Sequence, residues 1–166
     1  DVPHDRIQDP FEKNVPGMGL GRDPQRSPMQ WSAEAFAGFS TVEPWLPLAE
    51  DYEEVNVEAQ RDDPRSMLSL YSRLIDLRRG SRALEIGGFV PVSAHGDVLA
   101  YRREAEDERY LVLLNLGDEP HTIDRAEGAE PGRVVVATDP DREGEEIGST
   151  VDLGPHDGLV VRLQVD

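Results

Sequence analysis

Cysteine is absent from this 166-residue chain, and positively charged residues are scarce. Without thiols the chain has no means to form a disulfide, an iron–sulfur cluster or a thiolate zinc site. Lys and Arg together number 17 against 34 for Asp and Glu, which gives a formal charge of −17 at pH 7. Because nucleic acids and anionic membranes bind clustered positive charge, we expect neither as a partner. No apolar run approaches the roughly 20 residues of a membrane-spanning helix.

Signals for export, metals and cofactors are lacking as well. The stretch from Asp1 to Asp5 has neither the basic region nor the apolar core of a signal peptide, so we expect a cytoplasmic protein. No histidines stand at metal-ligand spacing. Residues 139–144 begin like a calcium loop, but Thr150 stands where a bidentate carboxylate is needed. No nucleophile elbow, phosphate-binding loop or dinucleotide fingerprint occurs, so we predict no metal and no cofactor.

Residues 1–63 are rich in proline and glycine and show little hydrophobic periodicity. The prolines forbid a long helix, so at most one short helix is predicted, around Met29 to Phe36. A stretch this long without regular structure is typical of a functional loop laid over a scaffold. Aromatic side chains are expected to hold this loop in place through their apolar area, namely Trp31, Phe36, Phe39 and Trp45.

A single amphipathic helix is predicted from Pro64 to Arg79. Asp63 is suited to cap its N-terminus, Pro64 fits the first helical position, and Gly80 can end it. Apolar residues recur at a spacing near 3.6 and form one stripe, made of Met67, Leu68, Leu70, Tyr71, Leu74, Ile75 and Leu77.

The rest of the chain, from about residue 84 to residue 166, has the alternation and turn residues of β-structure. The predicted strands are Phe89–Val92, Val98–Arg103, Tyr110–Leu116, His121–Ile123, Arg133–Thr138, Thr150–Leu153 and Leu159–Val165. The strand at 111–116 is apolar on both faces, which indicates a central position. Seven or eight short antiparallel strands in this length are typical of a Greek-key sandwich.

One motif in the N-terminal loop has the composition of a binding site. Arg22 and Arg26 are four residues apart, Pro24 and Pro28 keep this stretch out of a helix, and Trp31 follows it. A guanidinium on a rigid backbone can donate two parallel hydrogen bonds to a carboxylate or to neighbouring sugar hydroxyls, and an indole offers an apolar face to a sugar ring. Alternatively, both arginines hold the loop together through carbonyl and carboxylate groups of the chain.

Several blocks of the chain resemble the oligo-1,6-glucosidase and α-glucosidase branch of glycoside hydrolase family 13. They occur in that family's order and spacing over residues 1 to about 90, and the β-region resembles its C-terminal domain more weakly. The blocks are 2–14 (VPHDRIQDPFEKN), 21–31 (GRDPQRSPMQW), 37–40 (AGFS), 44–47 (PWLP), 55–60 (VNVEAQ) and 74–79 (LIDLRR). Trehalose synthases share several of them.

The resemblance implies an α+β fragment. Residues 1–83 would be the long final βα loop and last helix of a (β/α)8 barrel, and residues 84–166 an antiparallel Greek-key β-sandwich. It also implies that all three catalytic carboxylates lie upstream of Asp1, so no catalytic residue is assigned in this chain. Three substrate-binding positions carry over: Arg26 at the non-reducing glucose, Arg22 beside it, and Asp5 at the next sugar subsite.

The predicted function is therefore that of the C-terminal portion of a retaining α-glucosidase-like hydrolase, whose partners are α-glucosides and its own missing barrel segment. The chain alone is expected to be inactive. Three alternatives stay open: a trehalose synthase-like transglycosylase or isomerase fragment, a free-standing carbohydrate-binding or interaction module, and a non-catalytic relative with a membrane anchor. A carbohydrate-binding module would need stacked exposed aromatics, and the β-region offers Phe89, Tyr101 and Tyr110.

Overall fold

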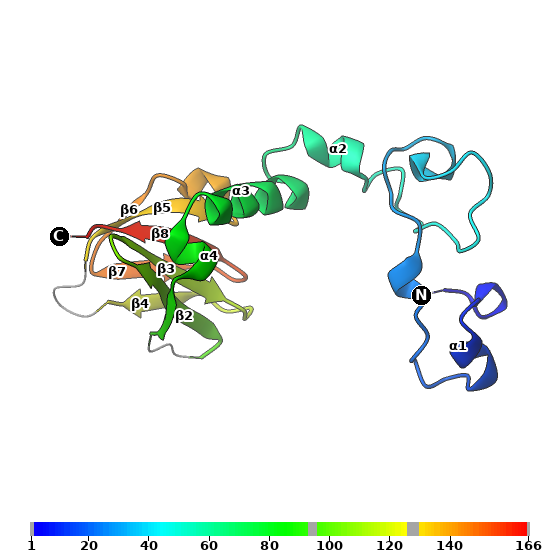
Figure 1. Ribbon diagram of the computed structural model, residues 1–166, viewed down its shortest axis with the longest axis horizontal. Helices are drawn as coiled ribbons and strands as arrows, with labels where there is room; N and C mark the ends of the chain where they lie inside the picture. The colour runs from blue at the N-terminus through cyan, green and yellow to red at the C-terminus, as the bar shows by residue number, and fades with distance from the viewer. Residues whose placement is uncertain (1, 93–95, 126–129, 166) are drawn as a thin grey trace. The chain divides into compact units, whose positions relative to one another are not determined.

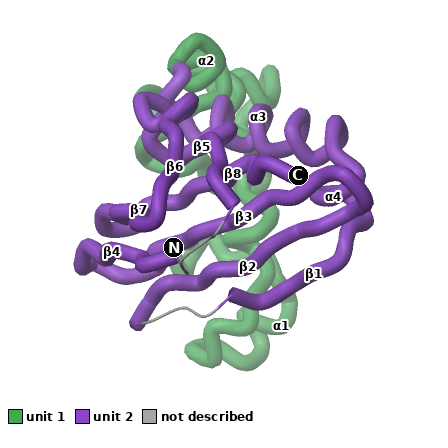
Figure 2. Tube along the Cα trace, turned by 90° about the vertical axis from the view of Figure 1, so that its left-hand side faces the viewer, with its two compact units in different colours: residues 1–63 green, residues 64–166 purple. Residues whose placement is uncertain are grey.

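The computed structural model describes residues 2–92, 96–125 and 130–165. The chain divides into two compact units, unit 1 with residues 1–63 and unit 2 with residues 64–166 (Figure 2). This division falls ahead of the long helix, not after residue 83, because that helix packs within unit 2. The assignment of residues 1–83 to a barrel stays a prediction. Within the described ranges, no helix is long and apolar enough to cross a membrane.

Unit 1 is a chain of turns with five short helices in its described residues. They are the 3-10 helices η1 (His4–Arg6), η2 (Pro24–Arg26) and η3 (Ala35–Gly38), and the α-helices α1 (Pro10–Asn14) and α2 (Val57–Arg61). The prediction of at most one short helix here was wrong. Capping accounts for α1 and α2, because the side chains of Asp9 and Asn56 accept hydrogen bonds from amides in the first turns. Helices of one turn leave no hydrophobic period in the sequence.

The backbone at 36–38 turns left-handed, with φ of 55° at Phe36, 57° at Ala37 and 63° at Gly38. The Ala37 carbonyl accepts hydrogen bonds from the amides of Trp31 at 2.9 Å and Ser32 at 3.2 Å, which holds the turn closed. The helix predicted from Met29 to Phe36 therefore does not form, because the chain reverses direction at residues 36–38. Only η3 follows, over Ala35–Gly38.

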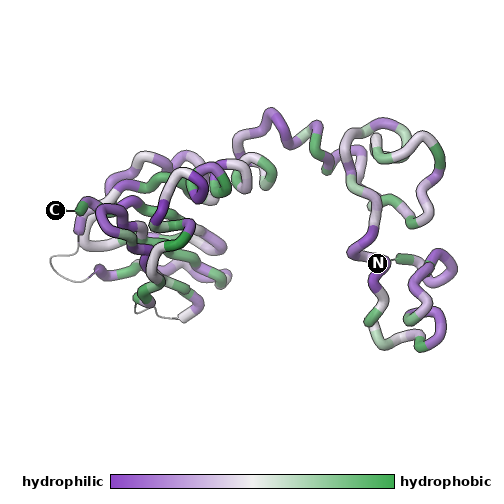
Figure 3. The backbone as a smooth tube through the Cα atoms, viewed as in Figure 1, coloured by the Kyte–Doolittle hydropathy of each residue, from purple (hydrophilic) through white to green (hydrophobic). Residues whose placement is uncertain are grey.

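The aromatic side chains of unit 1 do not hold it together as predicted. Trp31 is 50% exposed, Phe39 49% and Trp45 65%. Apolar positions occur along the whole path of unit 1 (Figure 3), yet few of them are buried. Its buried residues are largely polar or small, namely Asp9, Asp23, Pro28, Ala37, Leu46 and Asn56.

Unit 2 is built on antiparallel strands (Figure 1). Its strands are β1 (Gly88–Pro91), β2 (Val98–Ala105), β3 (Glu108–Asn115), β4 (His121–Asp124), β5 (Gly132–Ala137), β6 (Glu146–Ile147), β7 (Thr150–Leu153) and β8 (Gly158–Leu163). In the described part, one sheet has the order β1-β2-β3-β8-β5-β6 and a second pairs β4 with β7. All seven predicted strands are confirmed within two residues at either end. Sequence reasoning missed β6, which has only two residues.

One hydrophobic core joins the two sheets. Leu111 and Leu113 on β3 pack in it with Leu159 and Val161 on β8, and Leu153 on β7 joins them from the smaller sheet. The prediction that β3 is central is confirmed, because β3 lies between β2 and β8 and its residues 110–113 are all buried. Tyr110 and Val112 are buried but lie outside this core, since alternate residues of a strand point to opposite faces.

Helices α3 (Met67–Arg79) and α4 (Arg82–Ile86) contact the larger sheet through β5 and through β2 and β3. The long predicted helix is confirmed, but it begins at Met67, because the Ser66 hydroxyl, and not Asp63, accepts the capping hydrogen bond. Its leucines are half-buried, and part of its apolar stripe is exposed to solvent: Met67 is 61% exposed, Tyr71 60% and Ile75 45%. The helix α4 was missed. It is one turn long, and Ser81 caps it.

Candidate functional site

The arginine motif of unit 1 is organised around two buried aspartates. Asp23 is 2% exposed, and its Oδ2 accepts hydrogen bonds from the amides of Gln8 at 2.6 Å and Asp9 at 2.9 Å. Its other oxygen, Oδ1, is buried and has no partner among the described residues. Asp23 thereby joins the start of η2 to the start of α1, which are 14 residues apart in the sequence.

Asp9 faces the two predicted arginines, and its side chain is fully buried. Its Oδ1 accepts from the amide of Phe11 at 2.8 Å, which caps α1. Its Oδ2 lies 3.1 Å from Nε of Arg22, which donates a hydrogen bond, and 3.7 Å from Nη1 of Arg26. One carboxylate therefore serves as the counter-charge for both guanidiniums.

The electrostatics of this cluster keep Asp9 ionised. The hydrogen bond from the Phe11 amide lowers the pKa of the Asp9 carboxyl, and the Arg22 guanidinium lowers it further against the opposing effect of burial. Asp9 is therefore a buried, ionised carboxylate next to two guanidiniums. It can hold both arginines in position, but it carries no proton and cannot act as an acid. The exposed sides of Arg22 and Arg26, at 64% and 43% of their side-chain surfaces, keep N–H donors available to a ligand.

The structure brings Arg22 and Arg26 together and leaves Asp5 apart. Asp5 lies exposed on η1, and no hydrogen bond or ion pair between the described residues joins it to this cluster. A hollow in unit 1 has a volume of about 350 Å³ and is lined by neighbouring residues, among them Ile7, Glu12 and Asp23. None of the three predicted substrate-binding residues lines it.

Sequence reasoning missed Asp9 and Asp23. A signal for Asp9 was present, because an aspartate directly before a proline marks the start of a helix. Nothing in the sequence indicates the role of Asp23, since its partners are backbone amides that the fold brings to it.

The loop at 139–144 is not arranged to hold a metal. Arg65 pairs with Asp139 at 2.9 Å and with Asp141 at 2.5 Å, and Asp139 also caps the short helix η4 (Pro140–Arg142). Within the described ranges, no three potential ligands gather into a cation site.

Comparison with known proteins identifies the family. A model of the alpha amylase catalytic domain matches residues 3–87. The chain belongs to the alpha-amylase family. This stretch of the alpha-amylase chain includes the arginine cluster, α3 and α4.

Similar full-length proteins cover both units of the alpha-amylase chain. Maltase 1 of Drosophila virilis is 35% identical over 153 residues, which are 87% of this chain and 24% of the relative. Glucan 1,6-alpha-glucosidase of Streptococcus dysgalactiae subsp. equisimilis is 33% identical over 166 residues, 99% of this chain and 29% of the relative. The chain thus spans about a quarter of the length of these curated relatives.

Solved structures resemble it as well. The trehalulose synthase MutB from Pseudomonas mesoacidophila MX-45 superposes with a TM-score of 0.79 at 30% identity, over 87% of this chain and 26% of that one. The isomaltulose synthase PalI from Klebsiella sp. LX3 gives the same TM-score of 0.79 at 29% identity, over 87% and 26% of the two chains.

Proposed function

We propose that this chain is the C-terminal portion of a retaining α-glucosidase-like hydrolase that acts on α-glucosidic bonds of small oligosaccharides. In this proposal, residues 1–83 are the final βα loop and last helix of a (β/α)8 barrel, and residues 84–166 form the C-terminal β-sandwich. The complete enzyme would form a covalent glucosyl intermediate on a carboxylate supplied upstream, and water would then release glucose with retained configuration.

The observation that carries the proposal is the anchored arginine pair in the segment that matches the catalytic domain. Asp9 holds Arg22 and Arg26 from behind and leaves part of each guanidinium open. The more exposed Arg22 makes the closer contact with Asp9, at 3.1 Å, whereas Arg26 is 3.7 Å away and has more of its donors uncommitted. Arg26 is therefore the better candidate for a ligand contact, and Arg22 for holding the loop.

Steady-state kinetics on the complete enzyme test this assignment with maltose and isomaltose as substrates. For Arg26→Ala we expect kcat/KM to fall by about thirty-fold or more, because the charge-assisted contact proposed between its guanidinium and the sugar is lost, while Arg22 still pairs with Asp9. Arg26→Lys should restore little, since lysine lacks the two-pronged geometry. Arg22→Ala should lower the melting temperature more than it lowers kcat/KM. The opposite pattern, with Arg22→Ala inactive and stable, would show that the pocket was assigned to the wrong arginine.

A second experiment concerns the 166-residue chain itself. Purified free of contaminating glucosidase, it should release no glucose from maltose, isomaltose or nitrophenyl glucoside. The reason is that the residues proposed as nucleophile and acid/base lie outside it. Turnover that survives repurification would contradict the assignment of the catalytic carboxylates to the upstream segment.

The likeness to a trehalulose synthase and an isomaltulose synthase favours one alternative, a transferase or isomerase of the trehalose synthase type. Product analysis of the complete enzyme separates the two proposals. A hydrolase accumulates free glucose from a disaccharide, whereas an isomerase converts it mainly to another disaccharide.

A free-standing carbohydrate-binding module has weaker support. Phe89 is 60% exposed and its ring lies 5.0 Å from that of Tyr101, but Tyr110 is only 3% exposed and offers no stacking face.

A further inference from the structure

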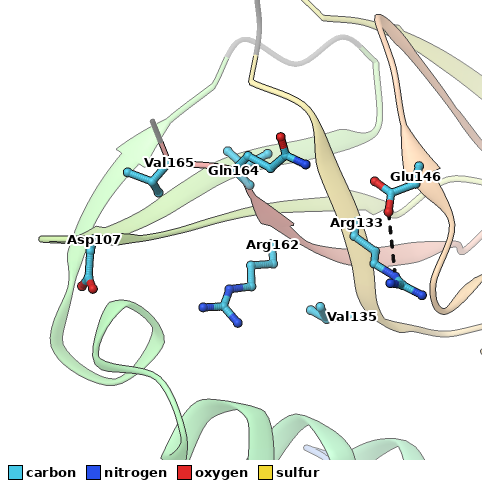
Figure 4. A pocket seen from close by; sticks show the side chains of 8 residues that line it. Asp107, Arg133, Val135, Glu146, Arg162, Gln164 and Val165 are labelled. Carbon is cyan, nitrogen blue, oxygen red and sulfur yellow. Dashed lines mark ion pairs between the residues drawn. The ribbon is translucent and has the colours of Figure 1, made fainter.

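Two neighbouring arginines do not by themselves form a fixed set of donors, as unit 2 shows. Arg133 on β5 and Arg162 on β8 are cross-strand Cα partners and line a hollow of about 680 Å³. Their guanidiniums extend away from each other, with Arg133 beside Glu146 (Figure 4). That ion pair is 4.0 Å long, and its two side chains are 65% and 66% exposed. Arginines that bind a ligand at a defined place need a buried partner, and the arginine pair of unit 1 has one.

The position of that buried partner, Asp9, is set by a second carboxylate. Oδ2 of Asp23 accepts hydrogen bonds from the backbone amides of Gln8 at 2.6 Å and Asp9 at 2.9 Å. The backbone carbonyl of Asp23 accepts another from the amide of Arg26 at 2.9 Å. Asp23 is therefore hydrogen-bonded both to the residue that supplies the counter-charge and to the residue that carries the guanidinium.

These contacts form a closed ring. The Asp9 carboxylate reaches back to Arg22, whose Nε lies 3.1 Å and whose backbone amide lies 3.3 Å from Oδ2 of Asp9. Arg22 directly precedes Asp23 in the chain. A displacement of Asp9 would therefore move the counter-charge of both arginines at once, and Asp23 is the residue that prevents it.

A direct role of Asp23 in binding a ligand is ruled out by its burial, because only 2% of the residue is exposed. One carboxylate oxygen accepts both amide hydrogen bonds, and the other has no partner among the described residues. The contribution of Asp23 therefore depends on the position of a single acceptor oxygen. An asparagine carbonyl has the same two lone pairs and can take that place, whereas alanine cannot.

We propose that Asp23 is a positioning residue, which places Asp9 and, through Asp9, the guanidiniums of Arg22 and Arg26. The placement of the arginines follows from the contacts alone, and its use in sugar binding rests on the proposed function. The physical effect is geometric, because a displacement of about 1 Å in a binding group is enough to cost a large part of the rate.

NMR of the arginine side chains in the 166-residue chain tests the placement without a substrate. The Nε–H proton of Arg22 is hydrogen-bonded to Asp9, so it should exchange slowly with water. In Asp23→Ala we expect this proton to exchange about tenfold faster or more, and in Asp23→Asn to remain close to the unaltered chain. If Asp23→Ala does not fold, Asp23→Glu replaces it with the same expectation, since it keeps the charge but displaces the oxygens. Unchanged exchange in the variant tested would overturn the proposal.

Asn56 supplies the matched control, because it is another buried polar residue of unit 1, only 4% exposed. Its side chain caps α2 at the amide of Ala59 and donates to the carbonyls of Tyr52 and Glu53. Asn56→Ala should lower the melting temperature and leave the exchange of the Arg22 proton unchanged. Equal acceleration in Asn56→Ala and Asp23→Ala would overturn the proposal, because it would show a general loosening of unit 1.

A double-mutant cycle in the complete enzyme tests the consequence for the sugar. Asp23→Ala should lower kcat/KM for maltose about tenfold, but less than about twofold further in an Arg26→Ala background, where no guanidinium is left to place. Effects that multiply would overturn the proposal, because Asp23 would then act independently of Arg26. Faster exchange of the Arg22 proton with unchanged kcat/KM would support the placement and overturn the proposed function of the pair instead.

Discussion

Unit 2 buries twelve apolar side chains in one cluster of its described residues, whereas the buried side chains of unit 1 include the carboxylates of Asp9 and Asp23 and the amide of Asn56. Apolar burial has no preferred direction and supplies most of the free energy of folding. Buried carboxylates supply directed hydrogen bonds instead, which fix the path of a loop but add little net stability. The comparison explains why a loop can display arginines at defined positions while its tryptophans remain exposed.

The difference also bears on which unit is able to fold by itself. The strands of unit 2 pair with one another and close a core that needs nothing from residues 1–63. Unit 1 has no comparable core among its described residues, and its exposed aromatics are available to pack against further protein. We therefore expect unit 1 to depend more on its polar contacts than unit 2 does.

The largest expected effect is a cavity in the core of unit 2. Leu159 is 0% exposed, so Leu159→Ala should lower the free energy of unfolding by about 2–5 kcal/mol. Urea titration followed by circular dichroism measures this change. Leu116→Ala is the matched control, since Leu116 is 66% exposed and its truncation should cost less than about 0.5 kcal/mol. Equal losses of stability in the two variants would contradict the claim that the buried apolar core stabilises unit 2.

A smaller effect, confined to unit 1, is expected when a buried carboxylate is removed. Asp23→Ala leaves the amides of Gln8 and Asp9 without their acceptor, which should cost about 1–3 kcal/mol of local stability. Hydrogen exchange should show faster exchange at residues 8 and 9 and unchanged exchange in β3 and β8. Asp23→Asn, which keeps one acceptor oxygen, should lose less, and Glu50→Ala, at an exposed carboxylate of the same unit, should change nothing. Loss of protection in both units would mean that they are not independent.

As the pH falls, unit 1 should lose stability before unit 2 does. The pKa of Asp9 lies below its ordinary value, so the folded state binds fewer protons there than the unfolded state. Its stabilisation is then complete above the ordinary aspartate pKa of about 3.9 and is lost as the pH falls through the lowered pKa. Hydrogen exchange at decreasing pH should release residues 8–26 before the strands of unit 2, whose core does not titrate. An Asp9→Asn chain should show no such acid step in unit 1, and an unaltered step would assign it to another group.

The smallest effect is expected at an exposed ion pair. Arg6 lies 3.1 Å from Glu43, whose side chain is 73% exposed. Because water screens such pairs, Glu43→Gln should change the stability of unit 1 by no more than about 0.5 kcal/mol. Thermal unfolding and exchange rates at the surrounding amides measure this. A loss as large as that of Asp23→Ala would show that surface charges, and not buried ones, hold unit 1 together.

Local patterns in the sequence were sufficient for the seven predicted strands and the long helix of unit 2, and for the family, but not for β6 and α4. The central position of the strand that contains residues 111–116 was predicted because both of its faces are apolar, and residues 111–113 are indeed buried. The helix near 67–79 was predicted from its period, and the blocks around Arg22 and Arg26 indicated the family that the match over residues 3–87 shows. The location of the protein, the role of Asp5 and the position of the catalytic carboxylates stay predictions.

The contacts between residues that are far apart in the chain became known only from the tertiary structure. The sequence does not indicate that Asp9 pairs with both arginines, that Asp23 binds amides 14 and 15 residues away, or that Arg133 and Arg162 are cross-strand partners. Periodicity reports the environment of one element, because it arises from the repeat of a helix or strand. A polar contact between distant segments has no period, so it exists only once the backbone has brought its donor and acceptor together.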